Sequence, residues 1–224
     1  MVHKGDETIP AHLSNYRFES IKYSGMNPVI LLADDHIMIS KGLRKAIELE
    51  FGYTAISSVT SCNEVMNELK KKKTTHLILD LGLTDGSALE VLPLIRRLYP
   101  GLHIMVFSGK PGSAYQRGLK QFGIHHFLSK AEDEDKTIVT LRKFFQNERV
   151  PPNADTHDNP FSALSSREME VLHYFLQGMR NSELCKILNI HFSTVSTFKN
   201  RILEKTQTHN LMELTELAMI YNIK

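Results

Sequence analysis

The sequence predicts an α/β domain with a five-stranded, doubly wound parallel sheet, followed by a smaller all-α domain. Five short apolar segments alternate with segments of helical periodicity, and short loops join them. Such alternation favours parallel strands that are covered by helices on both faces. A stretch with two prolines and several turn-forming residues then interrupts the pattern, and the residues beyond it show helical periodicity only.

The overall composition agrees with folded domains. The chain has 224 residues, of which 42% are hydrophobic and 23% charged. This composition excludes collagen-like, disordered and disulfide-rich chains, and no apolar run reaches the roughly 18 residues of a membrane span. Cys62 and Cys185 lie far apart and lack metal or redox spacing, so we expect reduced cysteines in a cytoplasmic protein without a membrane partner. The net charge of +2 favours no class of partner.

Each element of the α/β domain follows from a local pattern. Apolar segments place the strands at 29–33, 53–58, 76–79, 103–107 and 125–128. Apolar residues near helical spacing predict a first helix at 37–49. Ser61 and Glu64 form a capping box for a second helix, which ends in the basic run 70–73. The remaining helices are expected at 87–99, 111–122 and 133–147.

Changes in composition set the limits of the domains. Residues 1–25 are polar and lack the apolar stretch of a signal peptide, so we expect a flexible N-terminal extension. The α/β domain is expected at 26–147, a linker at 148–159 and the helical domain at 160–224. In the helical domain, a capping box of Ser165 and Glu168 predicts a helix that ends at Gly178. Further helices are expected at 182–188, 193–205 and 210–221.

Polar residues follow four of the five predicted strands. Asp34 and Asp35 end the first strand, Asp80 the third, Ser108 the fourth and Lys130 the fifth. The carboxyl ends of parallel strands meet at one edge of the sheet, where ligands bind. A single aspartate at a strand end is usually a turn or a helix cap, but polar groups at matching ends of four strands predict a site.

These groups are suited to accepting a phosphoryl group. Three carboxylates in one place repel one another unless a cation is present, and their hard oxygens suit Mg²⁺. Asp80, alone at the centre of the sheet, is the expected nucleophile. Lys130 would neutralise charge on the transferred oxygens, and the Ser108 hydroxyl would donate a hydrogen bond to one of them.

Residues 26–147 resemble the receiver domain of bacterial two-component response regulators, which has a flavodoxin-like fold. The matching motifs are L-L-A-D-D-H (31–36), L-I-L-D-L-G-L-T-D-G (77–86), V-F-S-G-K (106–110) and H-F-L-S-K (126–130). The resemblance implies that a sensor histidine kinase phosphorylates Asp80. It also implies a Mg²⁺ ion held by Asp34, Asp35, Asp80 and the backbone carbonyl of Gly82. Ser108 and Phe127 fall at the switch positions, and Lys130 falls at the position of the family's lysine.

The same resemblance limits the chemistry that we expect. A receiver catalyses its own phosphoryl transfer and a slow autodephosphorylation, so the chain is not expected to be an enzyme in any wider sense. Thr84 stands where the family usually has Pro, and Ala88 stands where it often has Gly. A phosphatase of the haloacid-dehalogenase type also uses an aspartyl phosphate, but it needs a second Asp two residues after the nucleophile. Gly82 occupies that position, which disfavours the phosphatase interpretation.

The C-terminal region resembles a LuxR-type helix-turn-helix domain. The matching stretches are L-S-S-R-E-M-E-V-L (164–172), N-S-E-L (181–184) and T-V-S-T-F-K-N-R-I-L-E-K (194–205). His191 replaces the usual serine ahead of the recognition helix. Together with the receiver, this domain indicates a response regulator of the NarL/FixJ type that binds double-stranded DNA.

The residues themselves support DNA binding less strongly than the resemblance does. Residues 160–224 carry seven Lys or Arg and six Asp or Glu, so the charge does not indicate DNA. Spacing alone equally supports a helical protein-binding domain with a solvated polar face. Short polar side chains that can reach base edges are Ser196, Thr197 and Asn200, and those expected at phosphates are Lys199, Arg201 and Arg180. Thr194 and Lys205 complete the expected DNA-binding set.

The last predicted helix carries an apolar stripe. Leu214, Leu217, Ala218 and Tyr221 lie on one face, which either packs on the preceding helices or meets a second copy of the chain. We expect a homodimer that phosphorylation favours and that binds a two-fold DNA site. The predicted function is therefore a phosphorylation-controlled transcription regulator. The alternative is a phosphorylation-independent regulator whose receiver serves dimerisation or protein interaction.

Overall fold

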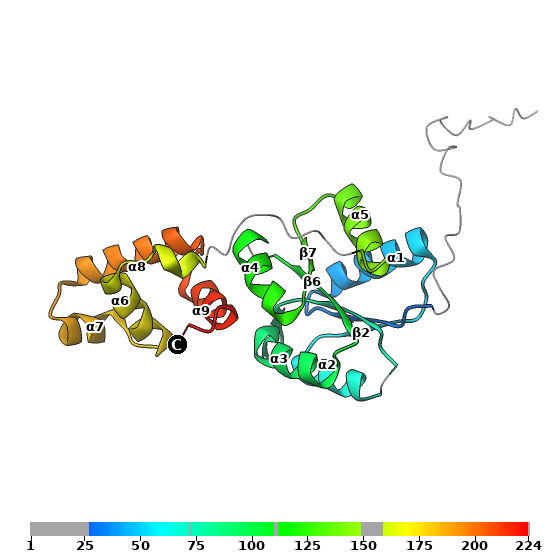
Figure 1. The fold of residues 1–224 in the computed structure, drawn as a ribbon, viewed down its shortest axis with the longest axis horizontal. Helices are drawn as coiled ribbons and strands as arrows, with labels where there is room; N and C mark the ends of the chain where they lie inside the picture. The colour runs from blue at the N-terminus through cyan, green and yellow to red at the C-terminus, as the bar shows by residue number, and fades with distance from the viewer. Residues whose placement is uncertain (1–26, 72, 110–111, 149–158, 224) are drawn as a thin grey trace, which may run out of the picture.

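The computed structural model describes residues 27–71, 73–109, 112–148 and 159–223. The predicted N-terminal extension and most of the predicted linker lie outside these ranges. Figure 1 shows an α/β part and a smaller helical part. Among the described residues, no helix combines the length and the apolar character that crossing a membrane requires.

The α/β part contains the five-stranded parallel sheet that the sequence predicts. Its strands run in the order β2-β1-β3-β6-β7, and every neighbouring pair is parallel. All four residues of β1 and of β3 are buried, as expected for strands covered on both faces. Ala33 is in register with Leu79, so the aspartates that follow these two residues leave the sheet side by side. The strands are β1 (Ile30–Ala33), β2 (Ile56–Val59), β3 (His76–Leu79), β6 (His103–Ser108) and β7 (His126–Ser129).

Two hydrophobic clusters hold the helices to opposite faces of this sheet. Helices α1 (Ile37–Phe51) and α5 (Glu134–Phe145) cover one face through side chains such as Ile47 and Phe144. The other face is covered by α2 (Cys62–Lys70), α3 (Ala88–Leu98) and α4 (Gly112–Leu119). Of the helix predicted at 111–122, residues 120–122 instead form a 3₁₀ turn, η1 (Lys120–Phe122), which ends at Gly123 in the left-handed conformation.

Two features of the α/β part were not predicted from the sequence. A small antiparallel hairpin follows Asp80, formed by β4 (Gly82–Leu83) and β5 (Gly86–Ser87). The predicted cap of α2 is also arranged differently. Ser61 Oγ accepts from the backbone N–H of Glu64, and the Glu64 carboxylate accepts from the backbone N–H of Thr60, one residue before the predicted cap.

The helical part consists of η2 (Pro160–Ala163), α6 (Ser166–Leu176), α7 (Asn181–Leu188), α8 (Phe192–Thr206) and α9 (Leu211–Ile220). The predicted capping box of Ser165 and Glu168 is present in full at the start of α6. Val195 and Ile202 project from α8 into the domain core and are fully buried. The two parts of the chain meet where α9 packs against α4 (Figure 1).

Candidate functional site

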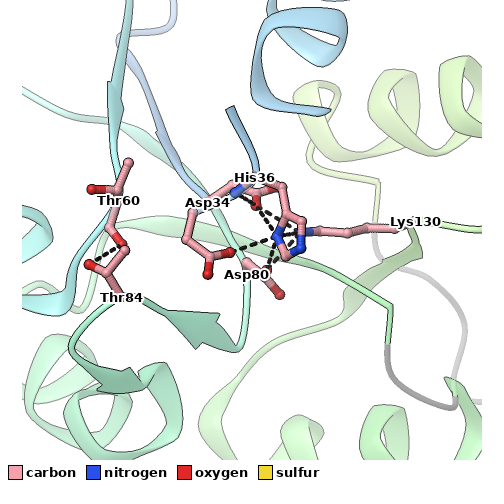
Figure 2. Close-up of polar contacts among 7 residues, drawn as sticks. Asp34, His36, Thr60, Asp80, Thr84 and Lys130 are labelled. Carbon is pink, nitrogen blue, oxygen red and sulfur yellow. Dashed lines mark hydrogen bonds and ion pairs between the residues drawn. The ribbon is translucent and has the colours of Figure 1, made fainter. Parts of the chain in front are cut away.

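The aspartates predicted to form a site lie together at the carboxyl edge of the sheet (Figure 2). Asp34 follows β1 and Asp80 follows β3, and each is only 5% exposed. Asp35 is next to Asp34 and more accessible, with 32% of its side chain exposed. The strand register brings the carboxylates together, because β1 and β3 are adjacent in the centre of the sheet.

Lys130 joins the two buried carboxylates. It follows β7, and its Nζ lies 2.6 Å from Asp80 Oδ2 and 2.8 Å from Asp34 Oδ1 (Figure 2). The lysine side chain is 10% exposed and passes over the ring of Phe107, with Nζ 5.7 Å from the ring centroid. Charge-assisted hydrogen bonds of this length are strong in a partly desolvated site. A single ammonium group therefore holds two strand ends at a fixed separation.

The acidic cluster has the donor set of a site for a hard cation. Asp34, Asp35, His36 and Asp80 each offer one ligand atom, and these atoms lie within 4.8 Å of one another. Asp34 Oδ2 is buried and has no hydrogen-bond partner among the described residues. A buried carboxylate oxygen without a partner is costly, and a divalent cation would satisfy it.

His36 also belongs to this cluster, although it had no predicted role. Its Nδ1 lies 2.6 Å from Asp35 Oδ1 and 3.3 Å from Asp34 Oδ1, and its side chain is 61% exposed. Its backbone N–H donates to Asp34 Oδ1 at 2.8 Å, which helps to fix the carboxylate. The only sequence signal for this residue is its position directly after the aspartate pair.

Ser108 and Phe127 lie where strands β6 and β7 approach the site. Ser108 is the last residue of β6 and is 1% exposed, and its carbonyl accepts from the backbone N–H of Lys130 at 3.0 Å. Phe127 is in register with Val106 and is half-buried on the face of the sheet that α4 covers. Ser108 thus ends the strand next to β3, and Phe127 lies on the face of the sheet that α4 covers.

The loop after Asp80 is tied to the start of α2. Both the backbone N–H and the hydroxyl of Thr84 donate to the carbonyl of Thr60, each at 3.0 Å (Figure 2). The Asp85 carboxylate accepts from the backbone N–H groups of Cys62 at 2.6 Å and Asn63 at 3.0 Å. These N–H groups keep the pKa of Asp85 below its usual range. Asp85 had no predicted role, because its partners are more than 20 residues away.

The predicted DNA-binding residues of α8 differ in exposure. Thr197, Asn200 and Arg201 are exposed, whereas Thr194, Ser196 and Lys199 are half-buried. The Thr197 hydroxyl donates to the carbonyl of Ser193 at 2.9 Å, which leaves its oxygen lone pairs and its methyl group to face outward. The remaining predicted phosphate contact, Arg180, is exposed just before α7.

Lys205 occupies a different environment from the other residues of this set. Its Nζ lies 2.7 Å from Glu168 Oε2, and the Glu168 side chain is 4% exposed. The ion pair with Lys205, together with the backbone N–H of Ser165, lowers the pKa of Glu168 to about 2. Lys205 thus forms an ion pair between α6 and α8, although 38% of its side chain is exposed. A phosphate would have to share its ammonium group with Glu168.

The predicted apolar stripe of α9 is covered within the chain. Leu214, Leu217 and Ala218 are at most 1% exposed, and Tyr221 is half-buried. From α4, Tyr115 donates through its hydroxyl to the carbonyl of Glu213 at 3.1 Å and to Glu216 Oε2 at 3.3 Å. Burial and the nearby Glu216 raise the pKa of Tyr115, so this hydroxyl remains a donor.

Further hydrogen bonds complete the contact between α4 and α9. The Tyr221 hydroxyl donates to the carbonyl of Ala114 at 3.0 Å, and the Gln121 amide donates to the carbonyl of Ile220. Gly118 lies directly against Ile220, and a methyl group at Gly118 would overlap that side chain. In this arrangement, α4 occupies part of the surface that a second copy of the chain would need to reach the stripe.

Comparison with known proteins identifies both parts of the chain. The family described as the response regulator receiver domain matches residues 30–142. The family described as bacterial regulatory proteins of the luxR family matches residues 162–218. The two matches fall on the α/β part and on the helical part, respectively.

Similar proteins match most of this chain over nearly their own whole length. The virulence factors putative positive transcription regulator BvgA of Bordetella pertussis is 28% identical, over 87% of this chain and 98% of that protein. The nitrate/nitrite response regulator protein NarP of Escherichia coli is 25% identical, over 85% of this chain and 94% of that protein. A solved structure of RcsB from Salmonella enterica serovar Typhimurium, bound to a promoter with the phosphomimetic BeF₃⁻, covers 88% of this chain and 100% of that one. It has a TM-score of 0.64 at 24% identity, which shows a common fold.

Proposed function

This chain belongs to the response regulators of the NarL/FixJ type, with a receiver domain followed by a LuxR-type domain, and we propose that it is a transcription regulator controlled by phosphorylation of Asp80. A sensor histidine kinase would be its phosphodonor and double-stranded DNA its target. Both partners place its activity in the bacterial cytoplasm. The domain limits that we propose are 26–147 for the receiver and 160–224 for the DNA-binding domain.

The observation that supports this function most directly is the paired contact of Lys130 with Asp34 and Asp80. An ammonium group 2.6 Å from the acceptor carboxylate can neutralise charge that develops on a transferred phosphoryl group. In the transfer, one Asp80 oxygen forms a bond to phosphorus while the bond from phosphorus to the imidazole nitrogen of the kinase breaks. The nitrogen keeps the electron pair of that bond. The Ser108 hydroxyl would donate to a phosphoryl oxygen.

The acidic cluster is suited to Mg²⁺ during this step. Asp34, Asp35 and Asp80 would hold the ion, with the backbone carbonyl of Gly82 as a further ligand. The buried and unpartnered Asp34 Oδ2 supports this assignment. When bound, Mg²⁺ supplies positive charge next to the phosphoryl oxygens. Lys130 would then exchange its contact with a carboxylate for a contact with the phosphoryl group.

The contact between α4 and α9 suggests how phosphorylation reaches the DNA-binding domain. Ser108 ends the strand next to β3, and Phe127 lies on the face of the sheet that α4 covers, so a change at Asp80 can shift the surface that holds α9. Release of α9 from α4 would uncover the face of α9 that carries Glu216 and Ile220, and so make it accessible to a second copy of the chain. We therefore propose a homodimer on a two-fold DNA site, favoured by phosphorylation.

The test is phosphorylation of the full chain with acetyl phosphate and Mg²⁺, followed by DNA binding. The wild-type chain should gain one phosphoryl group and bind its selected DNA more tightly, whereas Asp80→Asn should do neither. Equal DNA binding by both proteins, with and without the phosphodonor, would support the phosphorylation-independent alternative. Full labelling of Asp80→Asn would overturn the assignment of the acceptor.

A further inference from the structure

Phe192 is an unusual residue for the surface of this protein. It is the first residue of α8, and 60% of it is exposed. Every other phenylalanine and tyrosine among the described residues is buried or half-buried. Single exposed apolar residues are common on protein surfaces, but an exposed aromatic ring lacks the burial that stabilises the other aromatic rings of the described residues.

The position of Phe192 relates it to the predicted base contacts. Residues four apart on a helix lie in one row, and Phe192, Ser196 and Asn200 form such a row along α8. At 1.5 Å per residue, the row places Phe192 about 6 Å from Ser196 along the helix axis. Successive bases are about 3.4 Å apart along a strand. The ring is therefore within about two base pairs of the base that Ser196 would contact.

The chemistry of the ring restricts what it can recognise in a major groove. A phenyl group donates and accepts no hydrogen bond, so it cannot read the edges of adenine, guanine or cytosine. Thymine is the one standard base that presents an apolar group there, its C5-methyl. The N-terminal residues of a recognition helix are those that contact base edges.

We propose that Phe192 is a specificity-determining residue that contacts the C5-methyl group of a thymine at one position of each half-site. The proposal rests on the DNA-binding function proposed above and adds one base preference to it. The polar residues of α8 account for hydrogen-bonded readout and phosphate contacts, and Phe192 supplies apolar readout at the amino end of the helix. The proposal predicts that Phe192 contributes nothing to the affinity for unrelated DNA.

The experiment removes single methyl groups from the DNA. A preferred site is first selected from random duplexes with the acetyl-phosphate-treated full chain, and each thymine is then replaced in turn by deoxyuridine. At one position per half-site, wild-type affinity should fall about four-fold, the effect of burying one methyl group, about 0.8 kcal/mol. Phe192→Ala should bind the thymine and deoxyuridine duplexes equally, and Phe192→Leu should keep part of the difference.

Two controls test whether the effect is specific to Phe192 and to the selected DNA sequence. Met212→Ala removes another exposed apolar side chain, on α9, and should keep the full difference between thymine and deoxyuridine. Binding of Phe192→Ala to unrelated DNA should equal that of the wild type, with the same salt dependence. The proposal is overturned if no deoxyuridine weakens wild-type binding or if the effect persists in Phe192→Ala. A wild-type chain that binds no DNA at all would overturn the proposed function and this inference with it.

Discussion

At the scale of single residues, Thr84 shows how this chain replaces a residue that its family usually has. Proline at this position would fix one backbone angle and supply no N–H donor. Thr84 instead uses its N–H and its hydroxyl to hold the carbonyl of Thr60. The loop that carries the proposed Gly82 ligand is thus tied to the end of β2 by hydrogen bonds rather than by a rigid ring.

Removing the Thr84 hydroxyl should weaken this connection. Thr84→Val keeps the shape and the N–H donor, so we expect the free energy of unfolding to fall by about 0.5 kcal/mol, the lower range for one hydrogen bond. Thr84→Ser keeps the hydroxyl and is the control. Urea denaturation at neutral pH measures both variants. A Thr84→Val protein as stable as Thr84→Ser would show that the hydroxyl contributes nothing.

Two neighbouring residues of α8 should affect DNA binding in different ways. Lys199→Ala should weaken binding to all sequences alike, because a phosphate contact is lost. The slope of the logarithm of the binding constant against the logarithm of the salt concentration should fall in magnitude by about one. Asn200→Ala should instead relax the preference at one base pair, by about 1–3 kcal/mol. Affinities for selected and unrelated duplexes at several salt concentrations separate the two effects. Identical behaviour of the two variants would contradict the assigned roles.

At the scale of elements, the sequence predicted the strands and helices that carry a repeating pattern. It missed the features that are too short for a pattern or that depend on distant partners. The five strands and the main helices were predicted correctly, because buried runs and caps such as Ser165 with Glu168 are local signals. The hairpin after Asp80 contains two strands of two residues each, too short for any periodicity. The pairing of Lys205 with Glu168 was also missed, since it joins residues 37 positions apart.

The candidate site was predictable for a related reason. The aspartates and Lys130 each end a strand, and parallel strands bring their ends together whatever the rest of the sequence is. The partners of Asp85 could not be foreseen, because they depend on how the loop after Asp80 bends toward α2.

The opposite edge of the sheet carries a group of histidines. His76 begins β3, His103 begins β6 and His126 begins β7, and the His76 and His103 rings stack with centroids 4.9 Å apart. Phe144 and Phe145 of α5 pack against His76. Burial, and then the neighbouring His103, lower the pKa of His76 to about 4. Burial also lowers the pKa of His103, near Arg96, and of His126, near His125, His103 and Lys143.

The lowered pKa values of these histidines predict that the receiver loses stability in mild acid. The pKa of His76 is 6.5 in the unfolded chain and about 4 in the folded one, so the unfolded chain binds more protons between these values. The contribution of His76 to the free energy of unfolding is complete above about pH 6.5 and is lost as the pH falls toward 4. It amounts to about 3 kcal/mol, since each tenfold change in proton affinity corresponds to 1.36 kcal/mol.

Replacement of His76 tests this pH dependence. His76→Phe keeps an aromatic ring next to Phe144 and Phe145, and its unfolding free energy should change less between pH 6.5 and 4.5 than that of the wild type. His209→Phe, at an exposed site in the helical domain, should leave the slope unchanged. Urea denaturation across this range provides the data. Parallel curves for the wild type and His76→Phe would contradict the prediction.

At the scale of the whole molecule, the contact between α4 and α9 links the two domains. Its hydrogen bonds join residues about 100 positions apart, such as Tyr115 with Glu216. No local pattern could reveal it, and the apolar stripe of α9 was equally compatible with a second copy of the chain. The structure shows that the stripe is covered within one chain. In the homodimer proposed above, contact with α4 and contact with a partner would therefore compete for the surface around α9.

Gly118 provides the sharpest test of this competition. Alanine at this position suits a helix better than glycine does, but its methyl group would overlap Ile220 and press against the Tyr221 ring. Gly118→Ala should therefore leave the receiver stable while separating α4 from α9. Without a phosphodonor, we expect dimerisation and DNA affinity to rise about ten-fold, within the usual range of coupling between two sites. Small-angle scattering of the free protein should show a more extended chain.

Gly42→Ala is the matched control, because Gly42 also lies within a helix of the receiver, α1, but has open space around it. It should gain the same helix propensity without any change in shape, dimerisation or DNA binding. If Gly118→Ala behaves like Gly42→Ala in all three measurements, the contact between α4 and α9 does not restrain the DNA-binding domain. If Gly118→Ala alone binds DNA tightly without phosphorylation, the same contact is the restraint that phosphorylation of Asp80 must release, since both changes then act on one equilibrium.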